Sequence, residues 1–184
     1  TSPSGSGTIQ GTVRYDNNTA AENVSVSFAK SGTTVDDVST DARGDYSQDN
    51  LSLGTYTLTY TKSNFNDASL SATLATDNQT VTANVTLLAN TCSAGTVTGK
   101  ITDAVTSANV DNASINARSG LNVTSGSTTG TTTTATNGTY TLSSMSAGGY
   151  TVEVSKSGYI TTYFNVNVCG NLTNQDASMS EELS

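Results

Sequence analysis

Short runs in which apolar and polar residues alternate occur throughout the chain. Residues 24–28 read VSVSF and residues 55–60 read TYTLTY, so that every second side chain is apolar or aromatic. Alternation with a period of two is typical of strands with one buried face, because successive side chains point to opposite faces of a sheet. The spacing of an amphipathic helix does not occur. The pattern therefore predicts an all-β protein built from short strands.

The strand pattern occurs twice. Residues 7–13, GTIQGTV, recur as residues 95–101, GTVTGKI, and residues 53–58, LGTYTL, recur as residues 147–152, AGGYTV. Self-similarity on this scale indicates two copies of one structural unit. The second pair of segments lies six residues further apart than the first pair. We therefore expect a six-residue insertion in a loop of the second copy, at the Thr-rich stretch 124–134.

The repeat sets the expected domain boundaries. Residues 1–6 are expected to form a flexible leader, residues 7–88 a first β-sandwich, residues 89–91 a short linker and residues 92–184 a second β-sandwich. Each copy contains about seven short, evenly spaced strands, which is typical of antiparallel Ig-like sandwiches. A three-residue linker leaves little freedom, so the pair is expected to be semi-rigid.

The turn and core residues of both copies resemble those of the carboxypeptidase regulatory-like domain, a transthyretin-like (prealbumin-like) sandwich. The first copy supplies TDARGDY at residues 40–46 and LSLGTY at residues 51–56, and the second supplies TNGTY at residues 136–140 and GGY at residues 148–150. Ser52 and Ser146 stand where the family usually has proline. The resemblance implies a supporting role, because members of the family serve as accessory domains on secreted enzymes, receptors and surface proteins. Fold alone does not define function.

Composition narrows the possible partners. Only 12% of the residues are charged, the net charge is −8, and Ser and Thr together occupy 61 positions. Nucleic acids and anionic membranes require clustered Lys and Arg, so neither is an expected partner. No apolar run approaches the roughly 20 residues of a membrane-spanning helix, so no direct membrane span is expected.

Candidate catalytic and metal-binding chemistry is sparse. The chain has no histidine, which excludes Ser-His and Cys-His nucleophile systems, and we expect the protein not to be an enzyme. Asp37, Asp41 and Asp45 belong to the densest acidic cluster, and oxygen ligands from one loop suit Ca²⁺. The alternative is a solvated acidic turn around Gly44, and the second copy has neither Asp41 nor Asp45 in its turn. Ca²⁺ is the one cofactor that the sequence leaves open.

Cys92 and Cys169 are the two cysteines, and neither lies in a metal-binding spacing. A disulfide is the simplest interpretation. In the chain-entropy model it would contribute on the order of 4 kcal/mol to stability. Two free thiols in a reducing compartment are the alternative. Because the composition is that of an extracellular protein, we expect the disulfide and a secreted, extracellular or cell-surface location.

Three further chemistries are weaker. An isopeptide bond between Lys100 and Asn167 would need Glu153 as a core-facing acid, yet Glu153 alternates onto the face opposite Tyr150. Nine N-x-S/T sequons occur, only slightly more than chance would give in a chain this rich in Ser and Thr, so glycosylation is possible without being indicated. The cluster around Tyr163 offers one outward aromatic ring, which leaves sugar binding as a secondary hypothesis.

Two functions from different classes follow. The first is a structural subunit of a fibre, pilus-like appendage or surface layer that self-associates into a homopolymer. The closing segment of the second copy, residues 172–179, has little apolar surface, so a neighbour's strand is expected to complete that sheet. The predicted donor strand consists of Thr8, Ile9, Gln10, Gly11, Thr12 and Val13. The second function is an accessory, adhesin-like module that binds carbohydrate or another surface protein.

Overall fold

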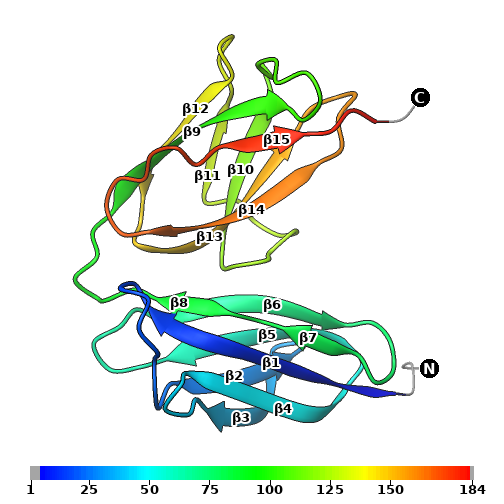
Figure 1. The fold of residues 1–184 in the computed structure, drawn as a ribbon, viewed down its shortest axis with the longest axis vertical. Coiled ribbons are helices and arrows are strands. Elements are labelled where there is room, and N and C mark those ends of the chain that lie inside the picture. The colour runs from blue at the N-terminus through cyan, green and yellow to red at the C-terminus, as the bar shows by residue number, and fades with distance from the viewer. Residues whose placement is uncertain (1–4, 183–184) are drawn as a thin grey trace. The chain divides into compact units, whose positions relative to one another are not determined.

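The computed structural model describes residues 5–182. These residues form fifteen strands and no helix, which confirms the all-β fold class (Figure 1). The chain divides into two compact units, residues 1–91 and residues 92–184. Each unit is a sandwich of two sheets, as the repeat predicted. The predicted leader lies mostly outside the described residues, and strand β1 already begins at Ser6.

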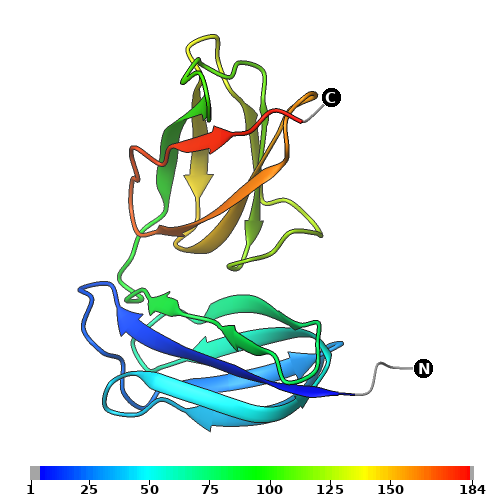
Figure 2. The same cartoon turned by 45° about the vertical axis from the view of Figure 1, so that its right-hand side comes forward.

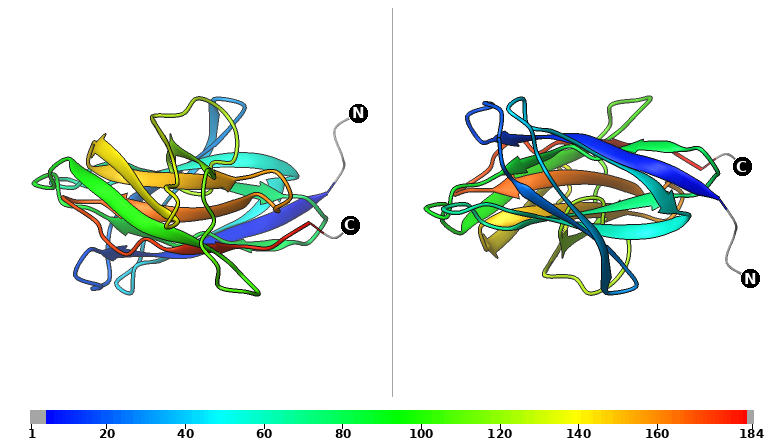
Figure 3. Two further views of the ribbon diagram at one scale, coloured as in Figure 1. Left: turned by 90° about the horizontal axis from the view of Figure 1, so that it is seen from above. Right: turned by 90° about the horizontal axis from the view of Figure 1, so that it is seen from below.

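The first unit packs one four-stranded sheet against another (Figure 2). One sheet has the order β4-β1-β7, with β8 also paired to β1, and the other has the order β3-β2-β5-β6. In Figure 3 the central strand β1, drawn in blue, extends along the length of its sheet. The strands are β1 (Ser6–Tyr15), β2 (Ser25–Lys30), β3 (Thr33–Ser39), β4 (Asp45–Ser52), β5 (Gly54–Thr61), β6 (Ala68–Leu74), β7 (Thr80–Thr82) and β8 (Val85–Leu87).

The second unit repeats this arrangement. Its sheets have the orders β12-β9-β15 and β11-β10-β13-β14, so β9 and β15 correspond to β1 and β8. The insertion lies between β10 and β11, at residues 120–129, whereas the expected stretch 124–134 includes all of β11. The strands are β9 (Gly95–Asp103), β10 (Ser114–Ser119), β11 (Gly130–Thr133), β12 (Thr139–Met145), β13 (Gly148–Ser155), β14 (Thr162–Val168) and β15 (Ala177–Met179).

The closing strands differ from the antiparallel sandwiches that the sequence predicted. Strands β7 and β8 run parallel to β1, and β15 runs parallel to β9. All other strand pairs within the sheets are antiparallel. Alternation reports which face of a strand is buried but not the direction of its neighbour, so a parallel closure was not visible in the pattern.

The two cores are built from different side chains. The first core contains large aromatic residues, with Phe28, Tyr56 and Tyr60 each at most 1% exposed. The second core has alanine at residue 117, the position that corresponds to Phe28, and contains the buried tyrosines Tyr140 and Tyr150 together with aliphatic residues and methionine, including Met179 at 0% exposure. Each unit thus buries its own apolar cluster, as a separately folding domain requires.

The start of the insertion packs on the outer face of the β10–β13–β14 sheet. Val123 N donates to Thr151 Oγ1 at 2.9 Å, and that hydroxyl donates to Gly120 O at 2.8 Å. Asn122 and Asn165 exchange two further hydrogen bonds. Thr151 is consequently 1% exposed although it lies on the polar face of its strand. The start of the inserted loop is therefore packed on the second unit, where Asn122 and Val123 bond to the sheet beneath them, whereas residues 124–129 are exposed.

Candidate functional site

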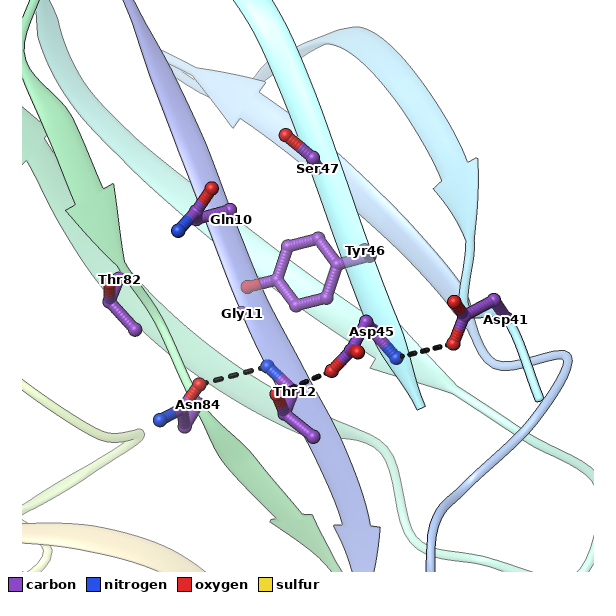
Figure 4. Close-up of a pocket in the computed structure, with 9 residues that line it drawn as sticks. All are labelled: Gln10, Gly11, Thr12, Asp41, Asp45, Tyr46, Ser47, Thr82 and Asn84. Atoms are coloured by element: carbon purple, nitrogen blue, oxygen red, sulfur yellow. Dashed lines mark hydrogen bonds between the residues drawn. The ribbon is translucent and has the colours of Figure 1, made fainter. Parts of the chain in front are cut away.

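A shallow polar groove lies on the outer face of the first unit, across β4, β1 and β7 (Figure 4). It has a volume of about 560 Å³. The strands present their polar positions here because the alternate residues, such as Ile9 and Val13, are buried in the core. Its lining includes the side chains of Gln10, Thr12, Asp45, Ser47, Thr82 and Asn84.

Several of the polar atoms along this groove bond to one another. Thr12 Oγ1 donates to Asp45 Oδ1 at 2.7 Å, and Thr12 N donates to Asn84 Oδ1 at 2.8 Å. Asp45 N in turn donates to Asp41 Oδ1 at 2.9 Å. Among the described residues, no buried side-chain nitrogen or oxygen lacks a partner. The two carboxylates of the groove, Asp41 and Asp45, thus accept hydrogen bonds from neighbouring protein groups.

Two tyrosines lie beneath the groove and join the two sheets. The hydroxyl oxygens of Tyr46 and Tyr60 lie 2.7 Å apart, and Tyr46 also donates to Ala83 O at 2.6 Å. Burial raises the pKa of Tyr46 to about 12 and raises the pKa of Tyr60 still further. Both groups therefore stay neutral at physiological pH. They fasten the turn between β7 and β8 to the core and are not poised as catalytic acids.

The acidic residues proposed for Ca²⁺ are not gathered into one site. Asp41 Oδ1 accepts hydrogen bonds from the backbone N–H groups of Arg43 and Asp45, which lower the Asp41 pKa. The Arg43 guanidinium lies 4.0 Å from Asp41 and 3.8 Å from Asp45, whereas Asp37 belongs to the separate strand β3. Within residues 5–182, no group of three His, Cys, Asp or Glu side chains is arranged to hold a metal ion. The acidic turn is organised by protein donors.

The two cysteines are joined in a disulfide, Cys92–Cys169, with a sequence separation of 77. The bond links the first residue of the second unit to the end of β14. Gly170 N also donates to Ser93 O at 2.8 Å, so a backbone hydrogen bond lies beside the covalent link. The disulfide thus closes the second unit within itself.

The predicted donor strand, Thr8–Val13, is the centre of its own sheet. It pairs with β4 on one side and with β7 and β8 on the other. The recipient edge expected on β9 is likewise occupied, by β15 and by a bridge from Leu172 to Val97. In this structure the chain therefore completes both sheets itself, and exchange would require a paired strand to leave.

Side-chain hydrogen bonds make up for the sparse apolar surface of the second closing segment. Asp176 Oδ1 accepts from Lys100 N at 2.7 Å, and Asn171 Oδ1 accepts from Thr96 N at 2.9 Å. Tyr140 donates its hydroxyl to Gln175 O at 2.7 Å. Hydropathy alone underestimates such a strand, because its polar residues bond to the backbone of β9.

Glu153 lies on the outer face of β13, as its alternation predicted. Its carboxylate is 3.0 Å from the Arg118 guanidinium, and these side chains are only 15% and 12% exposed. Burial raises the pKa of Glu153, but hydrogen bonds from Arg118 and two neutral neighbours lower it below its usual value. Glu153 is therefore an ionised partner of Arg118 and not the core-facing acid that an isopeptide bond needs. Tyr163, 41% exposed, stands beside this pair.

Two buried threonines were missed by the sequence reasoning. Thr40 Oγ1 donates to Ala21 O at 2.6 Å and accepts from Val24 N at 2.9 Å. Thr134 makes the corresponding bonds to Val110 O and from Ala113 N. Both threonines precede the turn glycine of their copy at the same spacing, and this shared position could have identified them. Thr134 was not recognised because it stands at the end of a run of four threonines.

The comparisons with known proteins agree with the repeated fold. The model of the carboxypeptidase regulatory-like domain matches residues 8–88 and again residues 96–180. The chain belongs to this family. Its two matches cover most of both units, which confirms the resemblance seen in the turn and core residues. Among curated protein sequences, none matches the chain.

Several solved pilins are distantly similar to the chain. A streptococcal ancillary pilin is 16% identical, with a TM-score of 0.38, and the match covers 97% of this chain and 63% of that one, less than two thirds of its length. The shaft pilin SpaA from Lactobacillus rhamnosus GG is 14% identical, with a TM-score of 0.38 and coverage of 97% and 99%. The major pilin subunit BcpA of Bacillus cereus is 10% identical, with a TM-score of 0.41 and coverage of 96% and 100%. These likenesses are too distant to carry an argument about function.

No helix among residues 5–182 is long and apolar enough to cross a membrane.

Proposed function

We propose that this chain is a non-enzymatic, extracellular structural module that self-associates into a fibre, pilus-like appendage or surface layer. The observation that carries the proposal is the way its polar groups are used. The carboxylates of the groove, of the acidic turn and of the outer face of β13 each bond to donors within the fold. Two such units in tandem, with a disulfide in the second, suit a load-bearing or surface-exposed role.

The edge of β3 is the best candidate contact for self-association. Strand β3 has seven residues and pairs only with β2 among the described strands. Val35 is 51% exposed on this strand. The corresponding strand β11 has only four residues. A longer edge strand rich in β-branched residues offers more unpaired backbone groups for another chain.

The edge is also partly protected against indiscriminate pairing. Asp36 and Asp37 lie in the middle of β3, and Asp36 Oδ2 accepts a hydrogen bond from Gln48 Nε2 at 2.6 Å. Charged side chains on an edge strand weaken pairing with a second negative chain. Salt screens that repulsion. Self-association at this edge should therefore strengthen as the ionic strength rises.

Negative-stain electron microscopy of the purified protein, together with sedimentation velocity, tests the proposal. We expect oligomers or filaments, and we expect Val35→Asp to shift the distribution toward monomers. Val105→Asp is the matched control, because Val105 is 87% exposed on a loop of the second unit, outside any strand. Monomers alone at every protein and salt concentration would overturn the assembly function. Assembly that is equally insensitive to both substitutions would exclude the β3 edge.

The polar groove favours a second candidate function, an accessory carbohydrate-binding module. Hydroxyl, amide and carboxylate groups of Thr12, Asn84 and Asp45 line it, and such groups recognise sugar hydroxyls. Tyr46 is 5% exposed, so its ring offers no stacking platform at the surface. A glycan array with no bound sugar would count against this alternative.

A further inference from the structure

All nine sequon asparagines are exposed in the structure. Asn84 differs from the others in its setting, because it belongs to the lining of the polar groove. Its sequon, Asn84-Val85-Thr86, runs from the turn after β7 into β8. The nine asparagines are Asn17, Asn23, Asn50, Asn78, Asn84, Asn112, Asn122, Asn137 and Asn171.

The carboxamide of Asn84 is held by its oxygen alone. Asn84 Oδ1 accepts the hydrogen bond from Thr12 N at 2.8 Å, and none of residues 5–182 accepts a hydrogen bond from Asn84 Nδ2. Figure 4 shows this nitrogen turned away from Thr12. A substituent on Nδ2 would leave the bond between Oδ1 and Thr12 in place.

The second unit shows that the structural role of Asn84 does not require an amide. Asp176 occupies the corresponding place ahead of β15, and its Oδ1 accepts from Lys100 N at 2.7 Å. Lys100 corresponds to Thr12. A carboxylate therefore performs the same backbone contact, and the nitrogen of Asn84 has no part in it.

We propose that Asn84 carries an N-linked glycan and that the first sugar of this glycan lies in the polar groove. The co-reactant is a glycan linked to a lipid diphosphate. The bond between its anomeric carbon and the phosphate oxygen breaks, a bond from that carbon to Asn84 Nδ2 forms, Nδ2 loses one proton to a base of the transferase, and the lipid diphosphate leaves. The proposal rests on export of the chain, which the proposed function assumes.

The groove suits a tethered sugar better than a free one. Gln10, Thr82 and Ser47 offer hydrogen-bonding side chains within the same hollow as Asn84. No exposed aromatic ring lines it, so a free sugar would bind by hydrogen bonds alone, in competition with water. A covalent link removes the entropic cost of association, so modest contacts suffice to hold the ring.

Two other sequons are less suited to substitution, whereas Asn17, Asn122, Asn137 and Asn171 also bond through Oδ1 and differ from Asn84 in lying outside the polar groove. Asn78 Nδ2 donates to Asp77 Oδ2 and Asn112 Nδ2 donates to Asp111 Oδ2, each at 3.1 Å. A glycan at either nitrogen would compete with these contacts. Asn78 lies only six residues before Asn84 and serves as a comparison site within the same region of the chain.

Glycopeptide sequencing of the protein isolated from its native source tests the proposal, with fragmentation that assigns the glycan to Asn78 or Asn84. We expect a glycan on Asn84 in most molecules. Asn84 unmodified in protein recovered outside the cell overturns the inference and leaves the structural function standing. Failure of export instead removes the proposed function, so the two failures are distinguishable.

Two variants separate loss of the glycan from loss of the fold. Asn84→Asp keeps an oxygen acceptor for Thr12, as Asp176 does for Lys100, and Thr86→Val removes the sequon hydroxyl while leaving Asn84. Both should abolish the glycan at residue 84 with an unchanged circular dichroism spectrum. In the glycosylated protein, nuclear Overhauser contacts between the first sugar and the methyl groups of Thr12 and Thr82 are expected. Their absence would refute the placement of the sugar in the groove.

Discussion

The disulfide should stabilise the second unit and leave the first almost unchanged. The perturbation is the double substitution Cys92→Ser and Cys169→Ser, which removes a link within residues 92–184. Cys92 is half-buried and Cys169 is exposed, so serine at these positions adds little cost of its own. The expected effect is therefore that of the lost cross-link.

The size of the effect follows from the length of the closed loop. The two cysteines are separated by 77 residues, and the loop-closure entropy for that length corresponds to about 4.5 kcal/mol at 25 °C. Native-state relaxation and residual structure in the unfolded chain usually reduce the measured value to roughly 2–4 kcal/mol. A loss in this range is a large part of the stability of a domain of this size.

Hydrogen exchange followed by mass spectrometry across a denaturant series resolves the two units by their peptides. We expect peptides from β9 to β14 to lose protection at lower denaturant in the double variant and peptides from β1 to β6 to stay unchanged. The four tyrosines in each unit make bulk fluorescence a poor substitute. A loss below about 1 kcal/mol, or equal losses in both units, would refute the reasoning.

Three further outcomes follow from the buried polar groups. Thr40→Val should destabilise the first unit by about 2–3 kcal/mol in urea denaturation, because it strands Val24 N and Ala21 O; a smaller loss would mean that water replaces the hydroxyl. Stability of the first unit should fall between about pH 10 and 12, since the unfolded chain releases the tyrosine proton there while Tyr46, with its pKa raised to about 12, retains it. Tyr46→Phe should reduce that pH dependence without abolishing it, because the pKa of Tyr60 is also raised, and an unaltered slope in the alkaline titration would contradict the assignment. Arg118→Met should cost the second unit about 1–3 kcal/mol and speed exchange in residues 120–129, because Glu153 loses its partner and Gly126 O its donor; normal protection of that loop would argue against its anchoring by this pair.

The fold was predictable because both copies alternate clearly and share their turn residues. Gly44 and Gly138 have φ angles of 80° and 76°. The following tyrosine lies at the same spacing in both copies, and this match helped to reveal the repeat. Asn64, which stands in place of a glycine, has a φ angle of 69°, close to the 86° of Gly158. Asparagine tolerates this left-handed conformation, so the substitution did not change the turn.

The features that the sequence left out depend on which strands meet in space. The parallel closure by β15 and the hydrogen bond from Lys100 N to Asp176 Oδ1 join segments far apart in the sequence, the two bonded residues being 76 positions apart, and no local pattern reports such a contact. At the acidic turn, by contrast, the sequence suggested a metal site that the structure does not assemble. Asp41 and Asp45 lie close together, as expected, but their oxygens accept hydrogen bonds from backbone N–H groups and from Thr12. Asp37 lies on another strand, β3. The amino-acid composition shows how many acidic residues there are, but it does not show which groups their carboxylates bond to.

Self-association is the central claim, and electron microscopy of the purified, disulfide-bonded protein tests it most directly. Samples spanning low to high ionic strength should be imaged alongside Val35→Asp and Val105→Asp. The account predicts filaments or ordered oligomers that increase with salt, decrease in Val35→Asp and persist in Val105→Asp. A uniform population of monomers under all of these conditions would contradict it.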